Sequence, residues 1–92
     1  MIVRILGEGQ LKVDDAASDE LNALDAALEK AVNEGNEQAF RPALVALLDR
    51  VRALGTPLAQ DVLEPSDSIL PRADADLDEV RHMLTDEGYI PG

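Results

Sequence analysis

The chain has 92 residues, and its 19 acidic and 8 basic residues give a net charge of −11 at pH 7. This charge argues against nucleic acid as a partner, because backbone phosphates would be repelled, and it disfavours direct adhesion to an anionic membrane for the same reason. The sequence has no cysteine, which excludes disulfides, thiolate nucleophiles and thiolate-ligated metals and favours a cytosolic setting for so small a domain.

The first predicted element is a β-hairpin over residues 1–13. Residues 1–6 are rich in β-branched and long aliphatic side chains, and residues 11–13 alternate apolar and polar side chains as a half-buried strand does. Between them, Gly7 and Gly9 supply the positive φ angles that a tight turn requires. Because a lone hairpin is marginally stable in water, we expect a helix or a third strand to cover its apolar face.

The first of two predicted helices covers about residues 16–34. Its apolar residues recur at helical spacing and form one stripe, whereas Asp25 and Glu29 fall on the opposite face. Gly35 supplies the left-handed residue that ends many helices, and Asn36 can cap the helix that follows. The pattern therefore predicts an amphipathic helix that packs through its aliphatic side.

The second helix is predicted over about residues 37–54, with Phe40 and a series of aliphatic residues on one face. Pro42 would remove one backbone hydrogen bond, so either the helix begins nearer Phe40 or it bends slightly at the proline. Because the connection through Gly35 is short, the two helices should form an antiparallel pair.

Residues 55–75 are predicted to be an irregular loop bounded by glycine and proline. Within it, residues 68–70 resemble a short strand, which we expect to add a third strand to the hairpin. A last helix is predicted over about residues 76–87, capped by Asp74 or Asp76. The predicted fold class is therefore α+β: an N-terminal hairpin with this third strand, packed on an antiparallel helix pair, with a short C-terminal helix.

A chain of this length should form one domain, residues 1–92, since it buries only about 60–65% of its unfolded surface and cannot support two cores. Phe40 and Tyr89 are the only aromatic residues, so the core must be aliphatic. No apolar run approaches the length of a membrane span, and the start of the chain lacks the basic residues and apolar run of a signal peptide. We therefore expect a soluble, cytoplasmic protein without direct membrane insertion.

The sequence offers no evident catalytic set, and we expect neither an enzyme nor a cofactor. His82 is the only histidine, and no nucleophile stands near it in a suggestive context, which favours a surface or packing role. Three acidic residues alternate in the manner of an EF-hand calcium loop, Asp74, Asp76 and Asp78. The match fails because Glu79 replaces the required glycine and Thr85 the bidentate glutamate. Helix capping explains these acids better than a metal does.

Taken whole, the chain resembles the PspA-associated protein family, PspAA. The resemblance rests on residues along the whole length: the start from Met1 to Gln10, Leu21 to Asp25, Val51 to Pro57, Pro65 to Asp67, Leu70-Pro71 and the final Gly92. It implies a non-enzymatic accessory protein that binds PspA, the coiled-coil protein of the phage-shock, or envelope-stress, response. Through that partner the protein would be recruited to the inner face of the membrane.

Two segments carry apolar residues outside the helical stripes and are our candidates for partner contact. The residues proposed are Leu58, Val62, Leu63, Asp67, Tyr89 and Ile90. The alternative is that both segments close over the helix pair and complete the core. A different role is also open, as a small acidic ion-binding domain or a homodimer that pairs through the exposed edge of the hairpin.

Overall fold

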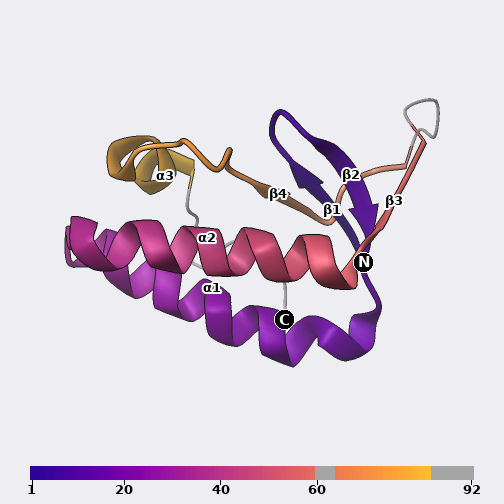
Figure 1. Ribbon diagram of the computed structural model, residues 1–92, viewed down its shortest axis with the longest axis horizontal. Helices are drawn as coiled ribbons and strands as arrows, with labels where there is room; N and C mark the ends of the chain where they lie inside the picture. Colours follow the sequence, from indigo (N-terminus) through magenta and orange to yellow (C-terminus); the bar gives the residue numbers. More distant parts are fainter. Residues whose placement is uncertain (60–63, 84–92) are drawn as a thin grey trace.

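The computed structural model describes residues 1–59 and 64–83, in which a sheet and a short helix lie on one side of two long helices (Figure 1). In chain order the elements are β1 (Ile2–Ile5), β2 (Gly9–Lys12), a 3-10 turn η1 (Asp15–Ala17), α1 (Ser18–Asn33), α2 (Glu37–Leu54), β3 (Thr56–Pro57), β4 (Ser68–Leu70) and α3 (Leu77–Met83). The predicted α+β class, with its hairpin, helix pair and short C-terminal helix, is confirmed.

The hairpin is formed by β1 and β2, which pair antiparallel with Val3 opposite Leu11 and Ile5 opposite Gly9. Its turn comprises residues 6–8, whereas the sequence pattern indicated residues 7–10, and Gly9 already belongs to β2. Gly7 and Gly9 have φ angles of 86° and 115°, which side chains other than glycine rarely adopt. The two glycines therefore shape the turn as predicted.

The sheet has four strands in the order β3-β2-β1-β4. β4 pairs parallel with β1, Val3 opposite Ser68, which confirms the predicted third strand. The sequence did not indicate β3, which pairs antiparallel with β2, so the predicted loop 55–75 contains two edge strands. β3 and β4 lie beside the two edges of the hairpin, so these two short strands are now the edges of the sheet.

The connection between α1 and α2 is a tight turn that satisfies the backbone at the end of α1. Gly35 has a φ of 63°, its N–H donates to the carbonyl of Val32 at 3.1 Å, and the N–H of Asn36 donates to that of Ala31 at 2.9 Å. This is the Schellman arrangement. The side chain of Asn36 then accepts from the N–H of Ala39 at 3.2 Å and caps α2.

α2 begins at Glu37 and runs through Pro42 without a later start. Pro42 is exposed, so its ring projects toward solvent. The expectation that the helix begins nearer Phe40 is therefore wrong. The stronger start signal is the Asn36 cap, because the cap and the packing of one apolar face outweigh a single missing backbone bond.

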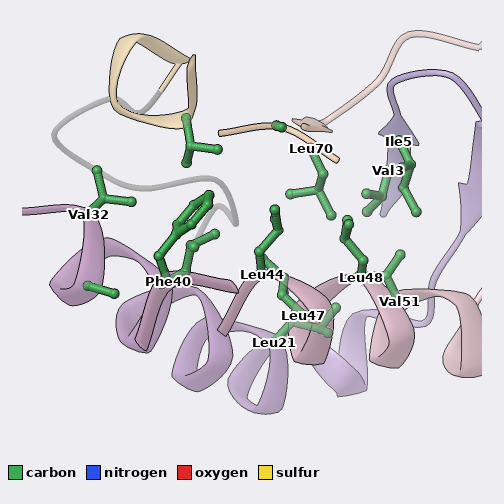
Figure 2. Close-up of a cluster of buried hydrophobic side chains, with 14 of the residues drawn as sticks. Val3, Ile5, Leu21, Val32, Phe40, Leu44, Leu47, Leu48, Val51 and Leu70 are labelled. Atoms are coloured by element: carbon green, nitrogen blue, oxygen red, sulfur yellow. The ribbon is translucent and has the colours of Figure 1, made fainter. Parts of the chain in front are cut away.

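The core lies between α2 and the inner face of the sheet. Figure 2 shows Leu44 and Leu48 pointing from α2 toward Leu70, while Val3 and Ile5 point down from β1. All five side chains are fully buried. The other fully buried large residues are Leu21, Leu28 and Val32 of α1, Leu47 and Val51 of α2, Val13 and Val80. Burial of apolar surface by one cluster, aliphatic except for Phe40, therefore holds the sheet and the helices together.

Asp25 corrects the predicted orientation of α1. It is only 4% exposed, whereas the helical pattern placed it on the solvent side, and Glu29 is half-buried. The buried part of α1 is therefore wider than the single stripe that its leucines define. None of the helices in the described ranges is both long and apolar enough to cross a bilayer.

Two arginines tie the α3 region to the helix pair. Arg41 of α2 donates to the carbonyl of Ala75 at 2.7 Å and to that of Ala73, and Arg81 of α3 donates to the carbonyl of Val32 at the end of α1, at 3.0 Å. Asp76 caps α3 as predicted, because its Oδ1 accepts from the N–H of Glu79 at 2.8 Å. The predicted extension of this helix over residues 84–87 lies outside the described residues.

Candidate interaction surface

A groove of about 1030 Å³ lies between the tip of the hairpin and the chain that follows β3. One wall is the hairpin, from Arg4 to Leu11, and the opposite wall contains Leu58, Glu64 and Pro65. β3 pairs with β2 only at Leu11 and Lys12, and the chain then leads away from the hairpin tip (Figure 1). The lining mixes apolar and charged groups, which is typical of a surface that contacts another protein.

Gln10 fixes the two walls relative to each other. Its side-chain amide donates to the carbonyl of Glu64 at 2.7 Å and to the hydroxyl of Ser66 at 2.8 Å. The backbone carbonyl of Gln10 accepts from the N–H of Leu58 at 3.0 Å. These bonds connect residues about fifty positions apart and give the groove a defined shape.

An ion pair holds the hairpin tip on the last turns of α2. The guanidinium of Arg52 donates through Nε to Glu8 at 2.9 Å and through Nη2 to the second oxygen of the same carboxylate. Its Nη1 also reaches Asp49 at 2.8 Å. The hydrogen bond from Arg52 lowers the pKa of Glu8. Partial burial opposes this shift, and the positive charge of Arg52 adds to it. The same bond raises the pKa of Arg52.

Replacing Glu8 by glutamine should lower the free energy of unfolding at neutral pH, by less than about 1 kcal/mol because both side chains are partly exposed. A carboxylate whose pKa is lowered in the folded state stabilises the fold above its unfolded value, about 4.3, and this contribution is lost as the pH falls through the folded value. The difference between the unaltered protein and Glu8→Gln should therefore shrink below about pH 4. Urea unfolding followed by circular dichroism at several pH values measures it.

Glu64→Gln is the matched control, since Glu64 is exposed and forms no ion pair within the described part of the chain. Its unfolding curves should follow those of the unaltered protein at neutral pH. A Glu8→Gln difference that stays constant from neutral to acid pH would contradict the role of this ion pair.

The structure describes two of the six predicted contact residues. Leu58 is half-buried and lines the groove. Asp67 is exposed, but it has a structural role: its Oδ2 accepts from the N–H of Ile2 at 2.8 Å, and its own N–H donates to the carbonyl of Ile2 at 2.8 Å. Asp67 thus fixes the start of β4 beside β1. The other four lie outside the described residues: Val62, Leu63, Tyr89 and Ile90.

Arg4 and the glycine-rich tip form the hairpin wall of the groove, and neither was among the predicted contact residues. The available signal was the alternation along β1, since Arg4 lies between two residues that point into the core. Alternation places Arg4 on the open face of the sheet. It does not reveal that the chain after β3 returns to build a second wall opposite it.

The alternating acids near α3 do not gather around a common centre. Asp76 serves as the helix cap, and Asp78 lies 3.9 Å from Arg81. In residues 1–59 and 64–83, no three histidine or carboxylate side chains are placed to hold a metal ion. His82 is exposed, and its Nδ1 lies 2.7 Å from the carbonyl of Asp78 one turn earlier.

Comparison with known proteins gives one match. The chain matches the family described as PspA-Associated protein over residues 1–92, its whole length. No curated protein and no solved structure matches it. The match agrees with the resemblance carried by the motifs along the sequence, and the chain belongs to the PspA-associated protein family.

Proposed function

We propose that this protein is a non-enzymatic accessory protein that binds a PspA-type coiled-coil protein in the envelope-stress response. The observation that carries the proposal is the family match over all 92 residues, which makes the whole domain, rather than an appended segment, the PspA-associated unit. Binding would adjust the assembly of the coiled-coil partner. The protein would act in the cytoplasm and reach the inner face of the membrane through that partner.

The described groove supports a binding role. Its polar groups are largely engaged with the chain itself: Gln10 holds the opposite wall, and Glu8 and Arg52 hold each other. Groups engaged in this way give a surface a fixed shape, and little ordering entropy is then lost when a partner docks. A partly apolar wall around Leu58 supplies area that a partner can bury.

Size-exclusion chromatography with light scattering tests the proposal, using this chain alone and mixed with the PspA protein of the same organism at low and moderate salt. We expect co-elution, with a mass that gives the stoichiometry, and weaker association at moderate salt because the protein carries a net charge of −11. Separate elution under both conditions would overturn direct binding. A doubled mass for the chain alone would support a homodimer.

A further inference from the structure

The arginines of this chain divide into three groups. Arg50 and Arg52 pair with carboxylates, and Arg41 and Arg81 donate to backbone carbonyls of other elements. Arg4 and Arg72 are exposed and form no ion pair with any described residue. This is unexpected in a protein whose acidic residues outnumber its basic ones by 19 to 8, because carboxylates are abundant on its surface.

The two arginines without ion pairs lie on either side of the hairpin tip. Arg4 lines the groove described above, which also includes Gly7 and Gly9. Arg72 lines a second, smaller depression on the same tip, again with Gly7. A Cβ built on Gly7 would lie 3.5 Å from Nε of Arg72, so the guanidinium lies beside the turn. The hairpin tip thus carries a cationic group on each side.

Carboxylates also line these two depressions, and they do not neutralise the two arginines. Glu8 is bound by Arg52 through both of its oxygens. Glu64 and Asp74 line the depressions without an ion pair to any described residue. Three arginines therefore face three carboxylates around the tip, whereas the whole chain has a net charge of −11. These charges balance, so an acidic partner would meet less repulsion at the tip than the net charge of the chain implies.

We propose that the hairpin tip, with Arg4 and Arg72 as its anchoring cations, is the docking site for a carboxylate-bearing helix face of the PspA-type partner. The proposal rests on the proposed function and names the surface that performs it. A coiled coil buries its apolar seam and leaves positions on its flanks, often glutamate and lysine, for contact with other proteins. A guanidinium can hold a carboxylate through two parallel hydrogen bonds, which adds direction to the attraction.

The test is charge reversal of both arginines, Arg4→Glu with Arg72→Glu, against a matched control that reverses two other exposed cations, Lys12→Glu with Lys30→Glu. Lys12 and Lys30 also lack ion pairs within the described ranges, and they lie at the far end of β2 and on α1. Both double variants change the net charge equally. Binding to the PspA protein of the same organism is measured by isothermal titration calorimetry, and folding is checked by circular dichroism.

We expect the arginine double variant to bind at least about tenfold more weakly, because carboxylates would then face carboxylates across the interface. The lysine double variant should bind within about threefold of the unaltered protein. If both variants lose affinity equally, general repulsion is the cause and the hairpin tip is not the anchor. If both bind like the unaltered protein, the proposed docking site is wrong while the proposed function stands.

Two more outcomes distinguish loss of the proposed function from a role of the arginines in lipid binding. If the unaltered chain does not bind the PspA protein, the proposed function fails and the docking site with it. The second readout is sedimentation with vesicles of phosphatidylglycerol in the absence of PspA. If the unaltered chain binds these vesicles, and the arginine variant loses that binding but keeps its affinity for PspA, the cations serve an anionic lipid surface and the docking proposal is overturned.

Discussion

Replacing Leu48 by alanine should lower the free energy of unfolding by about 2–5 kcal/mol. Leu48 is fully buried in the middle of α2, and Figure 2 shows it between Leu70 and the valine and isoleucine of β1. Truncation removes apolar contacts with the sheet and leaves a cavity between the sheet and the helix pair. Other contacts hold both layers in place. The neighbouring elements can collapse only partly into that space, so the full effect of the cavity should be observed.

This loss is a large part of the total stability, since the free energy of unfolding of small domains is about 5–15 kcal/mol. Urea unfolding followed at 222 nm gives the free energy and the m-value, which should remain near that of the unaltered protein if both proteins unfold from the same fold. Val45→Ala is the matched control, because Val45 lies in the same helix and is 39% exposed. It should change the free energy of unfolding by less than about 0.5 kcal/mol. A Leu48→Ala loss no larger than that would contradict the position assigned to this side chain.

The parts of the fold that could be predicted are those whose signals are local. Gly35 and Asn36 ended one helix and began the next at adjacent positions, and the glycines at the hairpin turn adopt the positive φ angles that the pattern required. In each case the backbone conformation depends on residues within one turn, so the residue type alone is informative. The alternation along residues 11–13 likewise agrees with the structure, in which Leu11 and Val13 are buried and Lys12 is exposed.

Three features could not be predicted because they depend on residues far apart in the chain. β3 has only two residues, so it shows no periodicity, and one of them is Pro57, a residue type that is disfavoured in strands. It forms because it pairs with the edge of β2. Residues 68–70 were predicted to join the hairpin, but their parallel direction and their pairing with β1, Val3 opposite Ser68, were not. Asp25 is buried against the usual preference of aspartate for the surface, and no local pattern distinguishes it from an exposed acid.

The candidate site shows the same division. Leu58 could be singled out because an apolar residue in a loop needs an explanation, and it does line the groove. Asp67 could be singled out but not interpreted, since its bonds to Ile2 cross most of the chain. The lack of ion pairs at Arg4 and Arg72 becomes visible only after the partners of the other arginines are known, because local sequence says little about long-range ion pairs.

Gly55 joins α2 to β3, and an alanine there should disturb the edge of the sheet. A Cβ at this position would lie 2.8 Å from the carbonyl oxygen of Val51 and 2.9 Å from Cβ of Leu11. Neither atom is the free end of a flexible side chain, so the backbone of α2 or of β2 must move. The φ of Gly55 is −87°, which any residue adopts, and the effect therefore arises from close approach and not from backbone strain.

We expect Gly55→Ala to lower the free energy of unfolding by about 1–3 kcal/mol, the range for overpacking a tight contact. Thr56→Ala is the control: Thr56 is the next residue and is exposed, so its replacement should have an effect below about 0.5 kcal/mol.

Hydrogen exchange adds a local readout, because moving β3 away from β2 breaks the bond from the N–H of Leu58 to the carbonyl of Gln10. Protection at Leu58 should fall by more than global destabilisation accounts for. If protection there falls only in proportion to the global change, alanine is accommodated elsewhere and the contact between Gly55 and Leu11 does not set the position of the groove wall. Because that wall carries Leu58, a real shift should also weaken binding of the PspA-type partner, which connects the packing of one glycine to the proposed function.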